Sequence, residues 1–463
     1  MSQVSAPAPV VSTVPAAAGM PVLGVLPRFA RDPLNFLLDA ALRYGPVVRL
    51  DLASRSTYLV SHPEGVKYVL QDNNRNYRKG YDQAKPLMGE GLVTSEGEFW
   101  RSQRRLIQPS FSRQNLSEYA RVMVSATLDR LTHWEALARR RQPVNFGEEM
   151  MRLTQTIIVR TMFSDDVGDQ ADALGKAFDQ TLEHLNQVLF SPHPIFEKLP
   201  TPANRRHEQA LRFLDEFIYR LIEKRRQSGV ENGDLLSRLL MARDPESGEG
   251  MPDRQIRDEL MTIFLAGHET TANALAWTFF LLAQHPLVEF RLVDEIRQVV
   301  DNRPPSVEDL PAMPYGAMVF SEALRLYPPA WMFARHAIEE DVIQGYPIPA
   351  GTMIFLSPYV THHHPEYWEN PEAFDPERFS ETQSAQRPRY AYYPFGGGPR
   401  QCIGNHFAQM EAQLLMTIIL QHFRVELVEG IKVKPTPIAT LQPRPGVFVY
   451  LEKRQQAVRP QMT

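Results

Sequence analysis

The sequence predicts a mainly α-helical protein with a minor β component, arranged as one large domain. The first observation is the spacing of apolar residues, which follows the helical period over most of the chain before residue 337. The second is the change of pattern from Ala337, where short β-like pieces alternate with turns and Pro-rich loops. A last stretch of helical spacing covers about Asn405–His422. With 43% hydrophobic and 22% charged residues, the composition is that of an ordinary globular protein.

The predicted elements follow from the N-terminus. Residues 1–20 are rich in Ala, Pro and Ser and predict a flexible tail, after which residues 21–463 form the single domain. Asp32 is suited to an N-cap and Pro33 to the first helical position, which predicts a helix over residues 32–43. Two short strands and five long helices come next, at about Val47–Leu52, Tyr58–Ser61, Phe99–Leu106, Leu116–Arg141, Gly147–Met162, Gln170–Leu189 and Ala203–Gln227.

The longest predicted helix covers about Asp253–His285, between Pro252 and Pro286, with no proline inside it. At ~1.5 Å rise per residue it is roughly 45–50 Å long, enough to cross a domain of this size. Apolar residues lie on nearly all of its surface, and a helix of that kind is buried in a core. We therefore expect this helix to touch whatever the core holds.

Charge and cysteine content exclude several classes of protein. A net charge of −4 is not that of a nucleic-acid binder as a whole. A single cysteine excludes an internal disulfide framework and any CxxC zinc module, and it fits a reducing compartment. Pro7, Pro9 and Pro15 interrupt the N-terminal apolar residues, so we expect neither a signal peptide nor a membrane anchor. These observations predict a cytoplasmic, soluble protein, and we expect a monomer.

The one cysteine lies in the segment PFGGGPRQCIG, which contains Phe395, Arg400 and Cys402. The three consecutive glycines of this segment permit positive φ and close approach of the backbone to a flat or bulky object. Helical spacing begins directly afterwards, so Cys402 lies near a helix N-terminus, where a thiolate is favoured. Two alternatives are an inert buried cysteine and a phosphate-binding loop, although no Lys-Ser/Thr follows the glycines as a P-loop requires.

At this point the sequence resembles a known family. The segment matches the cysteine-ligand signature of cytochrome P450 enzymes, F-x-x-G-x-R-x-C-x-G, at every specified position. The resemblance extends from about Pro21 to Lys453 and implies the cytochrome P450 fold, with haem buried between the long central helix and the cysteine-loop helix. It implies haem b as cofactor and Cys402 as the thiolate ligand of the iron, which favours O–O cleavage.

Further motifs acquire meaning from this resemblance. Glu322 and Arg325 form an ExxR pair on one helix face, and Arg378 resembles the third member of that structural ion-pair network. The motif AGHETT resembles the oxygen-binding groove of the family, which makes Glu269 and Thr270 the catalytic acid–alcohol pair of a proton relay. Taken alone, these patterns are a solvated helix face and a helix kink, because glycine and threonine hydroxyls invite a local break in a helix.

The resemblance also implies contacts to the cofactor. Trp100 and Arg104 resemble the W-x-x-x-R helix that binds a haem propionate, and Arg335 and Arg400 match the arginines of the other propionate. The complete set of implied cofactor contacts is Cys402, Trp100, Arg104, Arg335, Arg400, Phe395, Gly396, Gly404, Ala266 and Gly267.

Substrate contacts are expected where the recognition segments of the family fall. These residues are all apolar and are Leu87, Met88, Leu92, Val93, Leu185, Leu189, Ile263, Phe264, Ala330, Trp331, Met332 and Ile438. Apolar residues of this kind predict a hydrophobic substrate, a fatty acid or a terpenoid. Arg55 and Tyr58 resemble a carboxylate anchor of some fatty-acid hydroxylases, or are an ordinary turn arginine and strand tyrosine. Three consecutive histidines, His362–His364, are expected in a polar surface loop rather than at a metal.

The predicted function is that of an O2-dependent monooxygenase that hydroxylates or epoxidises a hydrophobic small molecule. The alternatives are a peroxide-driven peroxygenase and a non-catalytic haem-binding sensor. No flavin-binding or iron–sulfur sequence follows the cysteine loop, so electrons from NAD(P)H are expected through a separate ferredoxin or flavodoxin and its reductase. Arg101, Arg105, Arg387 and Arg389 are candidates for a basic patch that such an acidic partner would contact.

Overall fold

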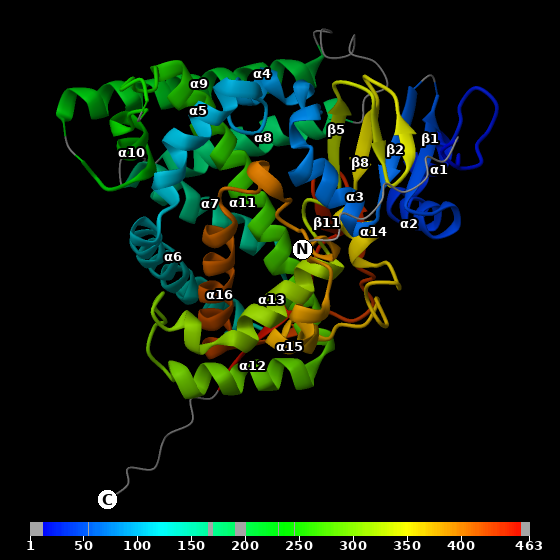
Figure 1. The fold of residues 1–463 in the computed structure, drawn as a ribbon. Helices are drawn as coiled ribbons and strands as arrows, with labels where there is room; N and C mark the ends of the chain where they lie inside the picture. The colour runs from blue at the N-terminus through cyan, green and yellow to red at the C-terminus, as the bar shows by residue number, and fades with distance from the viewer. Residues whose placement is uncertain are drawn as a thin grey trace, which may run out of the picture. The chain divides into compact units, whose positions relative to one another are not determined.

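A computed structural model describes residues 13–53, 55–164, 170–189, 201–229, 231–244 and 246–454. The α-helices are α1 (Leu26–Arg31), α2 (Pro33–Tyr44), α3 (Pro63–Lys67), α4 (Lys85–Met88), α5 (Gly97–Ile107), α6 (Arg113–Arg139), α7 (Phe146–Phe163), α8 (Ala171–Leu189), α9 (Pro202–Ser228), α10 (Leu235–Met241), α11 (Asp253–Gln284), α12 (Pro286–Val299), α13 (Pro314–Leu326), α14 (Pro358–His362), α15 (Glu381–Gln386) and α16 (Asn405–His422). The strands are β1 (Val47–Leu52), β2 (Arg55–Val60), β3 (Tyr77–Lys79), β4 (Val144–Asn145), β5 (Phe333–Ala337), β6 (Asp341–Ile343), β7 (Tyr346–Ile348), β8 (Met353–Leu356), β9 (Phe423–Leu427), β10 (Lys434–Pro437), β11 (Leu441–Arg444) and β12 (Phe448–Lys453). The mainly α fold with minor β that the sequence predicts is confirmed (Figure 1).

The chain divides into two compact units. Unit 1 comprises the described residues up to Asp82 together with Leu324–Cys402, and unit 2 comprises Gln83–Ala323 together with the described residues from Ile403. No helix in the described part of the chain combines the length and apolar character needed to span a membrane.

Unit 1 is built on a five-stranded sheet with the strand order β1-β2-β8-β5-β3. Only β2 and β8 pair in parallel, and the other neighbours are antiparallel. Beside the sheet lies an apolar cluster that includes Tyr58, Tyr77 and Tyr390. Pro15 and Ala17, which the sequence assigns to the tail, exchange backbone hydrogen bonds with Arg49 of β1 at 2.8 and 2.9 Å.

Unit 2 is organised around α11, which packs against α7, α9, α10, α12 and α16. Almost every side chain of α11 from Gln255 to Leu282 is buried, as its apolar surface predicts. The helix is continuous, so the local break expected at Gly267 does not occur. The hydroxyls of Thr270 and Thr271 instead bond the carbonyls four residues earlier without interrupting the backbone ladder.

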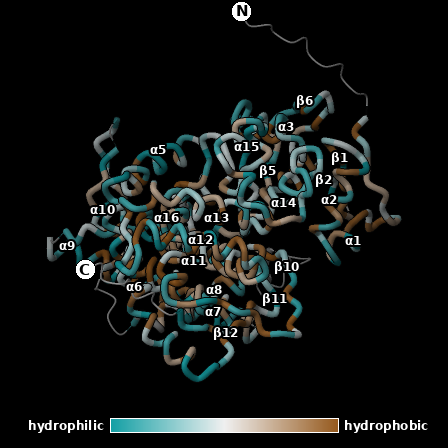
Figure 2. The backbone as a smooth tube through the Cα atoms, turned by 90° about the horizontal axis from the view of Figure 1, so that it is seen from below, coloured by the Kyte–Doolittle hydropathy of each residue, from teal (hydrophilic) through white to brown (hydrophobic). Residues whose placement is uncertain are grey.

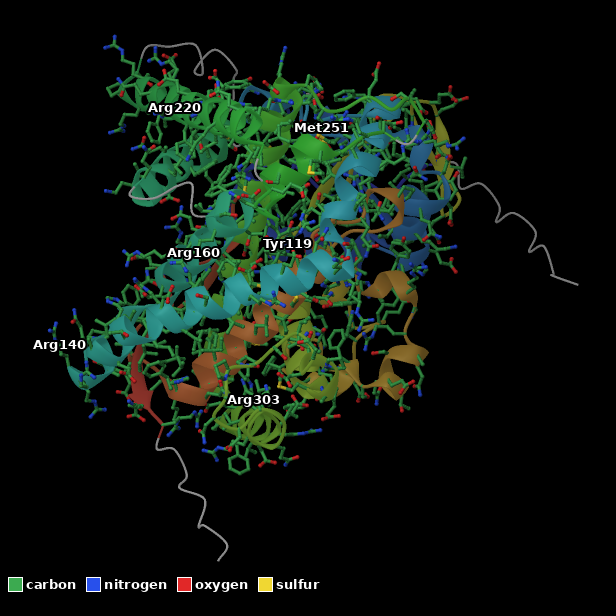
Figure 3. The ribbon with its side chains drawn as sticks, turned by 90° about the vertical axis from the view of Figure 1, so that its left-hand side faces the viewer. Tyr119, Arg140, Arg160, Arg220, Met251 and Arg303 are labelled. Atoms are coloured by element: carbon green, nitrogen blue, oxygen red, sulfur yellow. The ribbon has the colours of Figure 1, made fainter. Side chains whose placement is uncertain are left out.

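The surface helices of unit 2 are amphipathic. Figure 2 shows hydrophilic and hydrophobic stretches alternating along the tube. In Figure 3, Arg140 lies at the end of α6 and Arg220 on α9, and both are exposed, whereas Tyr119 of α6 is buried. This separation of charged and apolar faces is what docks the outer helices on the core.

Candidate active site

The cysteine loop lies in unit 1 and forms a tight turn. Gly398–Arg400 is one turn of 3-10 helix, and the backbone N–H of Cys402 donates to the carbonyl of Phe395 at 2.9 Å. The thiol of Cys402 is exposed, so the alternative of an inert buried cysteine is wrong. Helix α16 begins three residues later at Asn405, as the helical spacing predicts.

Two glycines of the loop are required by nearby protein atoms. A Cβ on Gly397 would lie 2.4 Å from the ring of Tyr390, and one on Gly398 would lie 1.9 Å from the carbonyl oxygen of Leu70. Gly398 also has a φ of 64°, which side chains rarely adopt. These glycines therefore let the loop pack closely against two other residues of unit 1, Tyr390 and Leu70. At Gly404, by contrast, a Cβ would meet no atom within 4 Å.

The two arginines expected at a propionate have different surroundings. Arg400 donates from Nη1 to the carbonyl of Asn74 at 3.1 Å and also to that of Tyr77, which attaches the cysteine loop to the first residue of β3 and to the segment before it. Arg335 on β5 is only 6% exposed and donates to the carbonyl of Ala334 at 2.8 Å. No carboxylate of the described residues forms an ion pair with this buried cation.

The ExxR residues are completely buried. Glu322 and Arg325 are both 0% exposed on α13. Arg325 donates to the carbonyls of His362, Pro371 and Ala373 at 2.7–3.0 Å, and its guanidinium lies 5.0 Å from the ring centroid of Trp368. This arginine therefore fixes the chain on both sides of the turn that follows α14.

Arg378, predicted as the third member of the network, is half-buried. It donates from Nη2 to the carbonyl of Asn370 at 3.0 Å. Beside it, the guanidinium of Arg387 lies 4.0 Å from the ring centroid of Trp368 and 4.9 Å from that of Phe379. Arg387 is thus engaged in packing, which reduces its value in the expected basic patch.

The AGHETT motif lies in the middle of α11, in unit 2. Ala266 is exposed and Gly267 and Thr270 are half-exposed, although the helix is buried on both sides of them. The Thr270 hydroxyl donates to the Ala266 carbonyl at 2.8 Å. One turn of an otherwise buried helix therefore presents small residues and a hydroxyl at an accessible face.

Glu269 is 1% exposed and is held by residues far away in sequence. Its Oε1 accepts hydrogen bonds from the hydroxyl of Thr440 and the amide of Gln442, both at 2.7 Å. Burial is the main cause that raises the pKa of Glu269, and the nearby carboxylate of Asp179 raises it further. No local sequence signal identified Thr440 and Gln442, because both lie more than 170 residues from Glu269.

A second buried acid, Glu411, was not among the site residues predicted from the sequence. Glu411 of α16 is 1% exposed, and its side chain hydrogen-bonds the hydroxyl of Thr271, the residue after Thr270. Burial raises the pKa of Glu411 to about 8. A glutamate at an apolar position of the predicted helix over residues 405–422 was the available signal.

Trp100 and Arg104 lie one turn apart on α5, in unit 2, with Trp100 9% exposed and Arg104 half-buried. The neighbouring basic residues are paired with acids. Arg105 binds Asp244 at 2.7 Å and Glu246 at 2.7 Å, and Arg101 pairs with Glu98. These carboxylates largely neutralise the basic patch expected on this helix.

The predicted substrate contacts are mostly buried. Leu87, Met88, Leu92, Ile263, Phe264 and Trp331 are at most 8% exposed, and Val93, Ala330, Met332 and Ile438 are half-buried. The ring of Phe264 packs between Phe178 and His268, with centroid distances of 3.3 and 4.6 Å. The side chains of Leu185 and Leu189 lie outside the described part of the chain.

The structure does not bring Arg55 and Tyr58 together as a carboxylate anchor. Three residues apart on β2, their side chains leave opposite faces of the sheet. Tyr58 belongs to the apolar cluster of unit 1, and Arg55 is exposed. Tyr58 is thus an ordinary strand tyrosine, and Arg55 is an exposed arginine at the start of β2 rather than in the turn.

The expectation of a polar surface loop at His362–His364 is wrong. His362 and His363 are 0% and 3% exposed. His362 Nε2 accepts the backbone N–H of Tyr393 at 3.0 Å, and burial lowers the pKa of both imidazoles. These histidines fill the interior of unit 1. Among the described residues, no three His, Cys, Asp or Glu side chains gather as a metal site.

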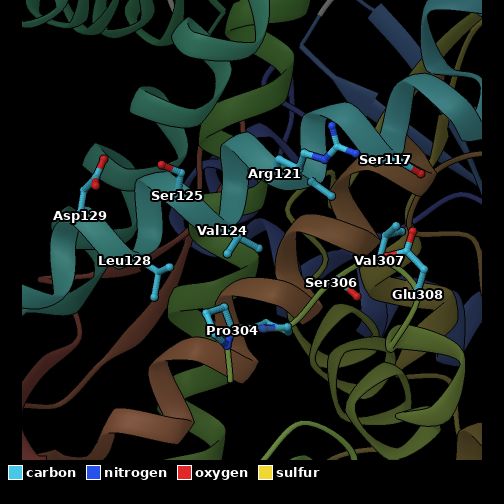
Figure 4. A pocket seen from close by; sticks show the side chains of 12 residues that line it. Ser117, Arg121, Val124, Ser125, Leu128, Asp129, Pro304, Ser306, Val307 and Glu308 are labelled. Atoms are coloured by element: carbon cyan, nitrogen blue, oxygen red, sulfur yellow. The ribbon is translucent and has the colours of Figure 1, made fainter. Parts of the chain in front are cut away.

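One cavity lies at the surface of unit 2. It has a volume of about 470 Å³ and is bounded by α6 and the segment from Pro304 to Glu308 (Figure 4). Val124 and Leu128 line it together with Arg121 and Asp129. It contains none of the predicted site residues, so we assign it no part in the reaction.

Comparisons with known proteins agree with these features. The family model for cytochrome P450 matches residues 14–450. Among curated relatives, cyclooctatin synthase of Streptomyces melanosporofaciens is 38% identical over 435 residues, which is 93% of this chain and 94% of the relative. Cyclooctat-9-en-7-ol 5-monooxygenase of the same organism is 38% identical over 422 residues, 90% of this chain and 91% of the relative.

Two further matches are equally extensive. Pentalenene oxygenase of Streptomyces avermitilis is 35% identical over 436 residues, 93% of this chain and 95% of the relative. The crystal structure of the cytochrome P450DA haem domain aligns with a TM-score of 0.88 and 28% sequence identity, covering 96% of this chain and 99% of that one. The chain therefore belongs to the cytochrome P450 family and is an oxidoreductase of the monooxygenase type, with the haem iron cofactor that the family implies.

Proposed function

We propose that this monooxygenase binds haem b through Cys402 and hydroxylates or epoxidises a terpenoid, using O2. Its electrons come from NAD(P)H through a separate ferredoxin or flavodoxin and its reductase. The observation that carries the proposal is the exposed thiol of Cys402, the only thiol in the chain, at the end of a tight turn. The terpenoid class rests on the names of relatives that cover nine-tenths of the chain, cyclooctat-9-en-7-ol 5-monooxygenase and pentalenene oxygenase.

The residues present fit a haem. A thiolate is the iron ligand that the chemistry requires, and Cys402 is exposed to supply it. Arg335 offers a buried cation, without a carboxylate partner among the described residues, to a propionate. Ala266 and Gly267 leave one turn of α11 accessible to a flat group. Apolar side chains of low exposure, such as Leu87, suit a terpenoid hydrocarbon.

The haem, when bound, would supply the iron at which O2 is reduced and from which one oxygen atom is transferred to the substrate. The protein supplies the ligand, the shape of the site and the protons. Glu269 holds a proton more tightly than an exposed glutamate, because burial raises its pKa. Thr270 carries its hydroxyl at the accessible turn of α11. We propose that protons pass from Glu269 to Thr270 and from Thr270 to the reaction.

The ligand assignment is tested with Cys402→Ala. The carbon monoxide complex of the reduced wild-type protein should show the absorption band of a thiolate-ligated haem, and the variant should lose it. Circular dichroism of both proteins checks that the variant is folded. A folded variant that keeps the thiolate band would refute Cys402 as the ligand.

The proton role is tested with Thr270→Ala. Electron use should become uncoupled from product formation, with peroxide released, measured as the ratio of NAD(P)H consumed to product formed. Thr278→Ala is the matched control, because Thr278 makes the same kind of bond, at 2.7 Å, to the carbonyl of Ala274 on the same helix. Equal coupling in both variants would contradict the proposed relay.

The substrate class is tested by titrating the haem-loaded protein with pentalenene, cyclooctat-9-en-7-ol and dodecanoate. Terpenoids should shift the Soret band at lower concentration than the fatty acid, and product should form with added redox partners. Tighter binding of dodecanoate would overturn the terpenoid class. Faster turnover with peroxide alone would instead favour a peroxygenase, and binding without any product would favour a sensor.

A further inference from the structure

The segment of residues 85–92, which we call the 85–92 segment, is fixed to α11 by buried carboxylates. Asp258 Oδ2 accepts the backbone N–H of Glu90 at 3.0 Å, and Glu259 Oε2 accepts that of Leu92 at 3.0 Å. Asp258 is 3% exposed and Glu259 is 0% exposed. Hydrogen bonds to buried carboxyl oxygens of this kind are strong because the surroundings are poor in water. They act on the backbone of a segment that has no strand or long helix of its own.

Neighbouring contacts close the same interface. Gln255 donates its amide both to the carbonyl of Glu90 at 3.1 Å and to Oε1 of Glu259 at 2.7 Å. Gly89 and Gly91 allow the approach, since a Cβ would lie 2.1 Å from the carboxyl of Asp258 at the first position and 2.0 Å from a hydroxyl of α11 at the second. The segment thus lies against α11 more closely than any residue with a side chain would permit.

Arg257 connects this interface to a third element. Its Nη1 donates to the carbonyl of Leu87 at 3.1 Å and to Asp258 at 3.0 Å, while Nη2 lies 2.6 Å from the carboxylate of Asp215 on α9. The Arg257 side chain is 8% exposed. One buried guanidinium therefore touches α4, α9 and its own helix α11 at the same time.

We propose that Arg257, Asp258 and Glu259 are positioning residues that fix the 85–92 segment against α11, connect it to α9 and thereby set substrate selectivity. The inference rests on the proposed function, because the segment matters for selectivity only as part of the substrate site. Fixing the backbone of the 85–92 segment orients the side chains of Leu87, Met88 and Leu92. A shift of α9 is transmitted to the segment through Asp215 and Arg257.

The chain provides a matched control for this network. Arg226 of α9 pairs with Asp253 of α11 at 2.6 Å, so it links the same two helices. Both side chains are about half exposed, and neither bonds the 85–92 segment in any described contact. Replacing this pair removes an ion pair between α9 and α11 without touching the buried network.

The first experiment measures backbone hydrogen–deuterium exchange in the haem-loaded full chain, for peptides that cover residues 85–95. Arg257→Gln should speed exchange at these amides by about tenfold or more, because the segment then opens more often. Arg226→Gln should leave it unchanged. If Arg257→Gln does not fold, Arg257→Lys keeps the charge but has fewer donors, and it should produce a smaller acceleration. Exchange in the folded Arg257 variant equal to that in the control would overturn the proposal.

The second experiment measures binding of imidazole and of 4-phenylimidazole by the absorption spectrum of the haem. Arg257→Gln should change the Kd of 4-phenylimidazole by about fivefold or more and that of imidazole by less than about twofold, because only the larger ligand needs an ordered apolar surround. Equal changes for both ligands would refute a role in selectivity. A wild-type protein that shows no nitrogen-ligated haem spectrum would refute the proposed function, whereas the exchange experiment would still test the positioning.

Discussion

At the scale of single residues, glycines are placed where distant parts of the chain come into contact. Gly91 is required by Thr262 of α11, and Gly398 is required by the carbonyl of Leu70. Gly91 lies more than 160 residues from Thr262 in the sequence, and Gly398 lies more than 320 residues from Leu70. The sequence shows only that glycine is present, and its necessity depends on an atom of another element.

Gly91→Ala should destabilise the protein by about 1–3 kcal/mol, because the new Cβ would overlap a side chain and a backbone carbonyl of α11. Thermal unfolding followed by circular dichroism measures the loss. Gly147→Ala is the control, since its Cβ would meet nothing closer than 3.4 Å in the first turn of α7. A Gly91→Ala variant as stable as this control would show that the close approach is relaxed in solution.

At the scale of elements, one buried carboxylate joins three helices. Asp234 caps α10 through the backbone N–H of Ser237 at 2.9 Å and also accepts from Arg225 of α9 at 2.8 Å. Its second oxygen accepts the hydroxyl of Ser164, which ends α7, at 2.9 Å. With the Asp234 side chain 2% exposed, one residue fixes three helix ends.

Asp234→Ala should cost about 3–5 kcal/mol, because it removes a cap and takes the carboxylate from a buried arginine. A lower midpoint of thermal unfolding would report this loss. Arg226→Gln, which removes an exposed pair on the same helix α9, should change stability by less than about 1 kcal/mol. Similar losses in both variants would mean that burial of the Asp234 pair has no energetic consequence.

At the scale of the whole molecule, several acids are wholly or partly buried even though they keep hydrogen-bond or ion-pair partners. Burial is the main cause that raises the pKa of Glu269, Glu289, Glu295 and Glu411. Each of these groups binds its proton more tightly in the folded protein than in the unfolded chain. The contribution of these groups to stability therefore falls as the pH rises through their raised pKa values.

Glu411 gives the clearest case, because its pKa rises from 4.5 to about 8. Its contribution to stability is complete below pH 4.5 and is lost as the pH rises to about 8, an effect of at most about 5 kcal/mol at 1.36 kcal/mol per pKa unit. Glu411→Gln should flatten this dependence, measured by denaturant unfolding between pH 5 and about pH 8. The exposed Glu426→Gln serves as control, and a variant at Glu411 with the same pH dependence as that control would contradict the assignment.

The sequence by itself determined the mainly α fold, the bounds of α11 and α16 to within one residue, and the family through Cys402 and its loop. These features are local, since helical spacing and a contiguous signature are written within one segment. Only the tertiary structure decided what holds Glu269, why Gly91 is a glycine and that His362 is buried. Each of those facts depends on atoms from remote segments, because a pKa, a steric overlap or a buried hydrogen bond exists only once folding has brought its partners together.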